Sequence, residues 1–278
     1  NQSYTEFSIN FIGKMDALQG VALVTGGVQG IGLGIVKQLL GNGIKGVSIC
    51  DIKEKEGEAI VQQLQHKHGK DKVIFIKTDV SQEEQMRDAF KNTLQHFGSL
   101  DIVVNNAGIC DEQQWRRAVA VNLNGSIQGN LLALDFMGKD QGGKGGVVVN
   151  VASTTGMGIA PFLPTYSATK HGIIGFTKSL STEFVWETTG VRVMAVCPGF
   201  TETDLATKDG KCCLNTYRKE WLPQLTKVLE QMEQQQKADC VGVAVVRMLR
   251  EGKTGSIWIA EDEEVYELNI PHYKQMRI

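Results

Sequence analysis

Short apolar runs alternate with longer amphipathic segments along almost the whole chain. Seven of these runs have the length of strands, and several are apolar at consecutive positions rather than at every second one. Continuous apolar runs are typical of strands that are buried on both faces of a parallel sheet. The seven predicted strands are VALVTG (21–26), GVSICD (46–51), KVIFIKTDV (72–80), LDIVVNNAG (100–108), GVVVNVAS (146–153), VRVMAVCPG (191–199) and GSIWIA (255–260).

Helical patterns occupy the intervals between these runs. Apolar residues recur there three and four positions apart, and a glycine that can adopt the left-handed cap conformation stands near the end. Examples are GIVKQLLGNG, EGEAIVQQLQHKHG and EQMRDAFKNTLQHFG. Strand–helix alternation of this kind specifies a doubly wound parallel sheet with right-handed crossovers. The pattern therefore predicts one α/β domain over residues 15–260, with about seven strands flanked by helices and no internal linker or repeat.

One segment departs from the alternation. Residues 204–236 stand between the sixth and seventh predicted strands. Four apolar side chains of this insert fall on one helical face: Trp221, Leu225, Val228 and Met232. The insert is a lid helix over a substrate, a helix packed on the core, or an amphipathic membrane contact. Its polar face carries both Glu and Lys, which disfavours the membrane. Ligands bind at the carboxyl edge of such sheets, which favours a lid or a packing helix.

The two ends of the chain also lie outside the pattern. Residues 1–14 lack the basic start and apolar core of a secretory signal, so we expect an N-terminal extension or a remnant of expression. Residues 261–278 form a C-terminal tail with three possible roles. The tail covers the pocket, reaches a neighbouring subunit or is mobile.

Composition narrows the classes of function. The 278 residues are 42% hydrophobic and 22% charged, and the net charge of −2 provides no basic field that would attract nucleic acid. No apolar run approaches the roughly 20 residues that span a bilayer. The cysteines form no C-x-x-C pair and predict reduced thiols in a cytoplasmic protein: Cys50, Cys110, Cys197, Cys212, Cys213 and Cys240. Adjacent cysteines space metal ligands poorly, so Cys212, Cys213 and His171 are not expected to bind a metal, and none is predicted.

A glycine-rich turn, TGGVQGIG, follows the first predicted strand and opens a helix. Its Gly26, Gly30 and Gly32 let the backbone approach a pyrophosphate, and the helix start offers unpaired N–H groups. This context is typical of a Rossmann-type dinucleotide site.

The expected cofactor follows from the end of the next strand. Asp51 stands there, about 20 residues past the last glycine of the turn, where a carboxylate accepts hydrogen bonds from the adenosine ribose and repels a 2′-phosphate. The turn has Gln29 rather than a cation, and no arginine stands beside Asp51, although Lys53 is close. These observations predict NAD rather than NADP.

A second motif consists of Ser153, Tyr166 and Lys170. Tyr166 and Lys170 are four residues apart and share a helical face. A tyrosine pKa near 10 is about three units too high for a base at neutral pH, which is roughly 4 kcal/mol. A positive charge about 4 Å away, at an effective dielectric near 20, supplies about that much. Ser153 ends the fifth predicted strand and can hold a substrate oxygen. The set predicts proton transfer to or from an alcohol beside a nicotinamide.

Six ordered motifs together resemble the short-chain dehydrogenase/reductase family over residues 18–260. Besides the turn and the Ser–Tyr–Lys set, they are Asp79-Val80, NNAG at 105–108, VNLNG around Asn122 and PGFTET at 198–203. The resemblance implies that Asn122 is a fourth catalytic residue, which supports a water linking the lysine to solvent. It also implies a homodimer or homotetramer formed through helices spanning about 113–138 and 165–185.

The same resemblance implies the residues of the cofactor site. Asp79 and Val80 contact the adenine, Asn105, Ala107 and Gly108 line the groove, and Thr203 holds the nicotinamide carboxamide. The full set of expected cofactor residues is Gly26, Gln29, Gly30, Ile31, Gly32, Asp51, Asp79, Val80, Asn106, Ala107, Gly108, Tyr166, Lys170, Pro198, Gly199, Thr201 and Thr203.

Three stretches resemble the NAD-dependent 15-hydroxyprostaglandin dehydrogenases within that family, namely residues 112–123, 134–153 and 166–179. GSIWIA and the tail beyond it resemble insect alcohol dehydrogenases. The prostaglandin enzymes have a glutamine three residues before the catalytic tyrosine, where this chain has Leu163. An apolar pocket is predicted from the insert and from Met157, Ile159, Phe162 and Leu163.

We therefore expect NAD-dependent interconversion of a secondary alcohol and a ketone on a hydroxy lipid, isoprenoid or steroid. An NADP(H)-linked carbonyl reductase uses the same residues and is the first alternative. A non-catalytic NAD-binding scaffold is the second, and it predicts an incomplete set of catalytic residues, whereas the set here is whole.

Overall fold

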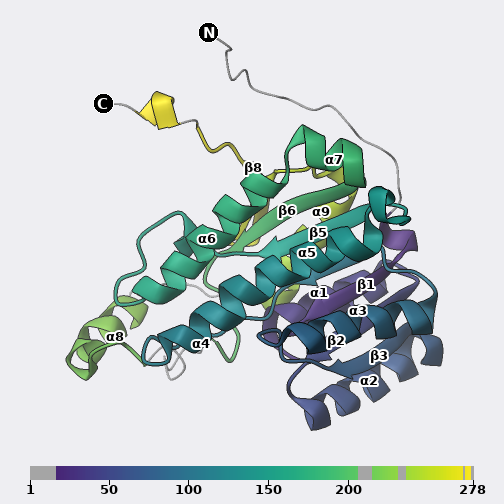
Figure 1. Cartoon of the computed structure of the whole chain (residues 1–278). Helices are drawn as coiled ribbons and strands as arrows, with labels where there is room; N and C mark the ends of the chain where they lie inside the picture. The colour runs from purple at the N-terminus through teal and green to yellow at the C-terminus, as the bar shows by residue number, and fades with distance from the viewer. Residues whose placement is uncertain (1–16, 206–214, 231–235, 272, 277–278) are drawn as a thin grey trace.

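A computed structural model of the chain describes residues 17–205, 215–230, 236–271 and 273–276. Its centre is an eight-stranded sheet in the order β3-β2-β1-β4-β5-β6-β7-β8 (Figure 1). The strands are β1 (Val21–Thr25), β2 (Gly46–Asp51), β3 (Val73–Lys77), β4 (Ile102–Asn105), β5 (Gly146–Val151), β6 (Val191–Pro198), β7 (Ile257–Glu261) and β8 (Glu264–Leu268). The first seven strands pair in parallel, which confirms the predicted doubly wound α/β sheet.

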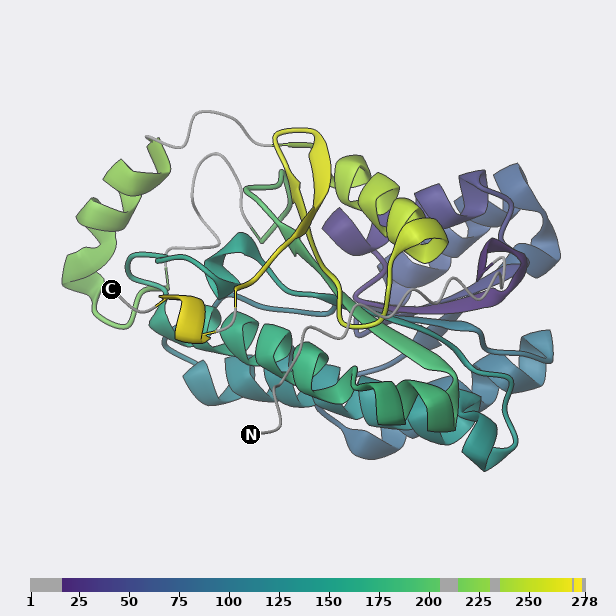
Figure 2. The ribbon, with the colours of Figure 1, turned by 90° about the horizontal axis from the view of Figure 1, so that it is seen from above.

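Helices cover both faces of this sheet (Figure 2). They are α1 (Gly30–Gly41), α2 (Glu54–His68), α3 (Glu83–Phe97), α4 (Trp115–Val119), α5 (Gly125–Met137), α6 (Pro164–Leu180), α7 (Glu183–Thr189), α8 (Leu222–Glu230) and α9 (Ala238–Glu251). The core on one face joins the strands to α1, α2 and α9, and the core on the other joins them to α3, α5 and α6. In the described part of the chain, no helix has the length and apolarity to cross a membrane.

The strands are as apolar as the sequence pattern indicates. Every residue of β1, β2, β4 and β5 is buried, because helices cover both faces of these strands. Of the predicted glycine caps, Gly98 after α3 has the left-handed conformation with φ of 76°. Gly69 after α2 has φ of 114° and ψ of 145°, so this helix ends without the predicted cap geometry.

The eighth strand was not predicted. β8 lies in the segment expected to be a tail, and it pairs antiparallel with β7 at the edge of the sheet. Asp262 and Glu263 connect the two strands with φ of 51° and 64°, and two positive φ values in a two-residue loop are typical of a tight hairpin. The strand has only partly buried and exposed residues, so it lacks the apolar run that marks the other seven.

Chain order reverses between β1 and β4, the two neighbouring strands from which the sheet grows in opposite directions. Ligands of doubly wound sheets bind outside the carboxyl ends of the strands at such a point. The described parts of the insert frame the same end: α8 stands apart from the two helical layers, beyond α4 (Figures 1 and 2).

Candidate active site

A cavity of about 650 Å³ runs along the carboxyl edge of the sheet. Most of the predicted site residues line it, from Gly26 after β1 to Thr203 after β6. Three of the predicted catalytic and cofactor residues do not: Gly32, Asn105 and Asn122. Each of these three lies next to residues that line the cavity.

The glycine turn between β1 and α1 is shaped by close contacts. Gly26 and Gly30 have φ of 63° and 53°, a region that only glycine adopts readily. A Cβ on Gly32 would lie 2.1 Å from the carbonyl oxygen of Gly26, so this glycine lets α1 begin against the turn. Gly30 and Ile31 at the start of α1 line the cavity, where the first N–H groups of a helix have no internal acceptor, and this cradle of residues 26–32 fits the pyrophosphate of a dinucleotide.

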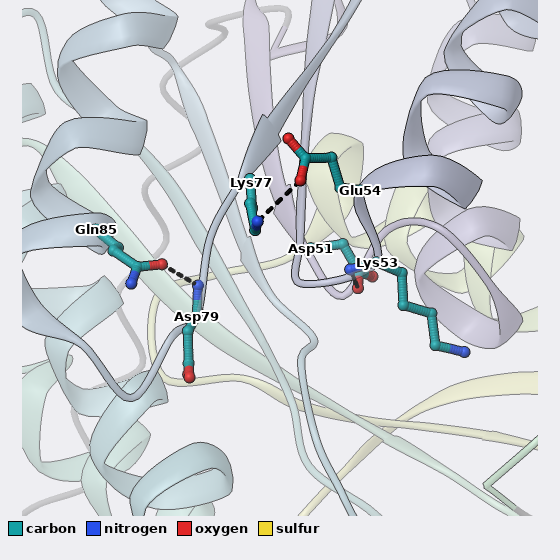
Figure 3. Close-up of polar contacts among 6 residues, drawn as sticks. All are labelled: Asp51, Lys53, Glu54, Lys77, Asp79 and Gln85. Carbon is teal, nitrogen blue, oxygen red and sulfur yellow. Dashed lines mark hydrogen bonds and ion pairs between the residues drawn. The ribbon is translucent and has the colours of Figure 1, made fainter.

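Asp51 is buried at the end of β2 and lines the cavity (Figure 3). Its carboxylate accepts hydrogen bonds from the backbone N–H groups of Val28 at 3.3 Å and Lys53 at 3.1 Å. The ammonium of Lys53 points away from this carboxylate and donates to the side-chain oxygen of Gln29. Lys77 donates to Glu54 at 2.8 Å. The two lysines near Asp51 thus have other partners.

Asp79 and Val80, in the loop after β3, line the cavity. The Asp79 carboxylate accepts from the backbone N–H of Ser81 at 2.9 Å and from its hydroxyl at 2.7 Å. The Asp79 backbone N–H donates to Gln85 at 2.8 Å (Figure 3). These contacts fix the loop so that the Val80 side chain packs against Gly125, where an added Cβ would lie 2.9 Å from Val80 Cγ2.

The two asparagines after β4 have different surroundings. Asn106 lines the cavity, and its amide donates to the carbonyls of Thr25 at 2.9 Å and Gly26 at 3.0 Å, which joins the ends of β4 and β1. Asn105 was expected to line the groove, and that prediction is wrong. As the last residue of β4 it projects to the opposite face, where it donates to Asn150 at 2.9 Å inside the core.

Ser153, Tyr166 and Lys170 come together on the cavity wall. Tyr166 stands in the first turn of α6, one turn before Lys170, and the Lys170 nitrogen is 5.5 Å from the centre of the tyrosine ring. Lys170 donates to the carbonyl of Val151 at 2.9 Å, and burial lowers its pKa to about 8. The Ser153 hydroxyl accepts from the backbone N–H of Thr155 at 3.2 Å, so its own proton is available to a ligand.

Asn122 lies behind this group in a single π-helical turn, Ala120–Asn124. Its amide makes paired 2.8 Å hydrogen bonds with the backbone of Ile109, and it donates to Thr169 of α6 at 3.2 Å. A Cβ on Gly108 would lie 3.5 Å from the Asn122 oxygen and 3.7 Å from the Lys170 nitrogen. The four predicted catalytic residues are therefore neighbours, with Asn122 fixing the backbone beside Lys170.

Apolar side chains enclose the end of the cavity beyond Tyr166. Leu225 of α8 is buried there and packs in one cluster with Cys110, Phe162, Leu163, Tyr166 and Leu205. The ring of Trp221, just before α8, lies 6.1 Å from that of Phe162 and is tilted by 51° to it. Met157 was predicted to line this pocket, but it packs instead against the core between α6, β6 and β7. Met232, Cys212 and Cys213, with residues 1–14, lie outside the described residues.

Two residues near the site were not predicted. Cys110 is a buried free thiol on the cavity wall, and nothing in the sequence marks it as a pocket residue. Glu112 is 1% exposed, and its carboxylate accepts from the backbone N–H groups of Thr165 at 3.0 Å and Tyr166 at 2.9 Å. A glutamate 52 positions before a helix carries no local capping signal, so only the folded chain reveals this contact.

Comparison with known proteins agrees with the resemblance predicted from the motifs. The family model described as short chain dehydrogenase matches residues 20–212. The NAD(+) 15-hydroxyprostaglandin dehydrogenase of Homo sapiens is 42% identical over 183 residues, 66% of this chain and 68% of that protein. Alcohol dehydrogenase 1 of Ceratitis capitata is 32% identical over 235 residues, 84% of this chain and 89% of that protein.

Solved structures share the architecture. A short chain dehydrogenase from Burkholderia cenocepacia, in complex with NADP, aligns with a TM-score of 0.72 and 26% identity over 88% of this chain and 98% of that one. A dehydrogenase/reductase from Sinorhizobium meliloti aligns with a TM-score of 0.73 at 23% identity, over 90% and 98% of the two chains, and shows the same fold.

Proposed function

The chain belongs to the short-chain dehydrogenase family, and from this premise we propose that it is an NAD-dependent alcohol dehydrogenase acting on a hydrophobic secondary alcohol. The observation that carries the proposal is the meeting of Ser153, Tyr166 and Lys170 on one cavity wall with the glycine cradle at its other end. A nicotinamide dinucleotide bound in the cradle supplies the acceptor for the hydride that leaves the alcohol carbon.

Tyr166 is the proposed acid–base. Its phenolate takes the hydroxyl proton of the alcohol in oxidation and returns it in the reverse direction. The positive charge of Lys170, one helical turn away, lowers the pKa of the phenol toward neutrality. Because burial lowers the pKa of Lys170 to about 8, its charge is lost as the pH rises past that value, and this support weakens.

Ser153 and Asn122 complete the proposed machinery. The Ser153 hydroxyl donates to the substrate oxygen while charge develops on it. Asn122 holds the backbone at Ile109 through two 2.8 Å hydrogen bonds and so keeps the space beside Lys170 open. In this proposal that space admits the water through which Lys170 exchanges protons with solvent.

NAD is the proposed cofactor because a carboxylate stands where a 2′-phosphate of NADP would have to bind. Asp51 lines the cavity, and the nearby Lys53 and Lys77 are engaged by Gln29 and Glu54. One observation favours the alternative of an NADP-linked carbonyl reductase, since the related Burkholderia structure is a complex with NADP. Comparing kcat/KM for the two cofactors decides between these functions.

A hydroxy lipid, isoprenoid or steroid is the proposed substrate class. Leu163, Leu205 and Leu225 offer no hydrogen bond to a polar group, and they lie beside Tyr166. A sugar or nucleotide alcohol would leave its hydroxyls unpaired against such a wall. A homo-oligomer and a cytoplasmic location stay predictions from the sequence.

The experiment is an initial-rate survey of cofactor reduction. Hydroxy lipids, isoprenoid secondary alcohols, hydroxysteroids and short secondary alcohols are each tested with NAD and with NADP. We expect a clear rate with NAD on one apolar class and little rate on the short alcohols. Equal rates on short and long alcohols would contradict the proposed substrate class, and a preference for NADP would contradict the proposed cofactor.

A further inference from the structure

Glu112 lies under the first turn of the helix that carries Tyr166 and Lys170. Its carboxylate oxygens accept from two successive backbone N–H groups, those of Thr165 at 3.0 Å and Tyr166 at 2.9 Å. These donors belong to the first turn of α6, where a helix has no internal acceptor for them. The residue before α6, Leu163, makes no side-chain cap, so Glu112 replaces a local cap with a distant one.

The burial of the Glu112 carboxylate makes it depend on its hydrogen bonds to the start of α6. Glu112 is 1% exposed, and within the described ranges no lysine, arginine or histidine forms an ion pair with it. A buried carboxylate is costly unless hydrogen bonds compensate it. The N–H groups and the partial positive charge of the α6 N-terminus provide that compensation, so the position of the helix and that of the glutamate depend on each other.

Glu112 is also joined to residues 215–230, whose Leu225 and Val228 line the cavity. Its backbone N–H donates to the carbonyl of Asn215 at 3.0 Å, and the neighbouring Gln113 side chain donates to the carbonyl of Thr216 at 3.4 Å. The Thr216 side chain is fully buried. The segment that begins here continues to Trp221 and α8, whose Leu225 packs beside Tyr166.

We propose that Glu112 is a positioning residue, which holds the N-terminus of α6 so that the Tyr166 hydroxyl meets Ser153 and Lys170, and which links that geometry to the docking of residues 215–230. The inference rests on the proposed function and deepens it. Glu112 itself touches neither substrate nor cofactor in this role. A displacement of about 1 Å at a reacting group costs about 100-fold in rate, so a small shift of the helix start is measurable.

Removing the charge of Glu112 has a second effect, on the pKa of Tyr166, and this effect would favour the phenolate rather than slow the reaction. The carboxylate neutralises the partial positive charge at the start of α6, close to Tyr166. Removing it leaves that charge free to stabilise the tyrosine phenolate, so the pKa of Tyr166 falls. Among the described residues, the titratable groups that share the cavity wall with the tyrosine include Lys170 on its own helix, Cys110 on the loop after β4 and Arg117 of α4; Cys197 of β6 interacts electrostatically with Lys170. None of these changes in a Glu112 variant.

The test compares Glu112→Gln and Glu112→Ala with Glu183→Gln as the matched control. Glu183 is an exposed glutamate in the first turn of the neighbouring helix α7. Gln keeps one acceptor oxygen for two donors, and Ala keeps none. Three quantities are measured: kcat on the best alcohol of the survey, the Kd of NADH, and the ionisation midpoint of Tyr166. The midpoint comes from the difference in tyrosinate absorbance between each protein and the same protein with Tyr166→Phe.

We expect kcat to fall about tenfold in Glu112→Gln and about 100-fold in Glu112→Ala, while the Kd of NADH stays within about twofold. The midpoint of Tyr166 is expected to fall by about half a pH unit in Glu112→Gln, because a charge several ångströms away is removed. The control changes none of the three. Unaltered kcat and midpoint in Glu112→Gln would overturn the inference. If the unmodified protein oxidises no alcohol but the midpoint still falls, the proposed function fails while the contact between Glu112 and the start of α6 stands.

Discussion

At the scale of single residues, the burial of the Lys170 amine carries a free-energy cost. Only 4% of the residue is exposed, and its pKa is lowered from the ordinary 10.5 to about 8 by burial. The unfolded chain therefore binds more protons than the folded one between these two pH values. The burial penalty acts in full below about pH 8 and disappears as the pH rises toward 10.5. This free-energy cost accompanies the placement of a positive charge beside Tyr166.

Replacing Lys170 by an uncharged residue tests the free-energy cost of burying its amine. Lys170→Met is expected to raise the free energy of unfolding at pH 7 by about 2–3 kcal/mol, because it removes a charge that folding must desolvate. The gain should shrink toward zero near pH 10.5. Denaturant unfolding without nucleotide at both pH values measures it, with the exposed Lys178→Met of the same helix as control. A loss of stability at pH 7 would contradict the burial penalty.

Asp51 carries the prediction about the cofactor. In the proposed function, Asp51 is the carboxylate that would accept from the ribose and repel a 2′-phosphate, so Asp51→Ala should lower the ratio of kcat/KM for NAD over NADP at least tenfold. Glu56→Ala removes an exposed carboxylate from the first turn of α2 and is the matched control, with no expected change. An unchanged ratio in Asp51→Ala would show that this carboxylate does not select the cofactor.

At the scale of elements, the turn between β1 and α1 determines where the cradle lies. Gly32 and Gly41 stand in the same helix, one at its start and one at its end. A Cβ on Gly32 would meet the Gly26 carbonyl oxygen at 2.1 Å, whereas nothing lies within 4 Å of a Cβ on Gly41. A substitution at Gly32 therefore tests the tight contact, and the same substitution at Gly41 tests helix propensity alone.

An alanine at each position checks this difference. Gly32→Ala should lower the free energy of unfolding by about 3 kcal/mol and weaken NADH binding, because the turn must open. Gly41→Ala should raise the unfolding free energy by up to about 1 kcal/mol and leave binding unchanged. Chemical denaturation and NADH fluorescence titration measure both quantities. Equal effects of the two changes would contradict the close contact at Gly32.

Elements with a strong local signal were predictable, and those set by distant contacts were not. The seven parallel strands have apolar runs that burial on two faces requires, and the glycine turn has its own chemistry. β8 is short and half-exposed, so only its pairing with β7 identifies it. Asn105 belongs to a predicted motif, but the alternation of β4 turns its side chain into the core. Glu112 caps a helix from 52 positions away, which no local pattern can indicate.

At the scale of the whole molecule, the sheet edge and helix α8 give the cavity two ends of different chemistry. The end near Asp51 is polar and rich in backbone donors, and it lies at the reversal of chain order between β1 and β4. The end near Leu225 is apolar and is enclosed by α8. Tyr166 stands between them, so a nucleotide at one end and an apolar alcohol at the other would meet at its hydroxyl.

The most direct test of this account is the turnover of Tyr166→Phe with NAD and the best alcohol of the survey. The change removes one oxygen atom and leaves the ring beside Lys170 and the glycine cradle intact. We predict that kcat falls about 10³-fold, the usual contribution of acid–base catalysis, while the Kd of NADH stays within about twofold. Near-normal turnover by Tyr166→Phe would contradict the account, because the proton would then leave the alcohol without this tyrosine.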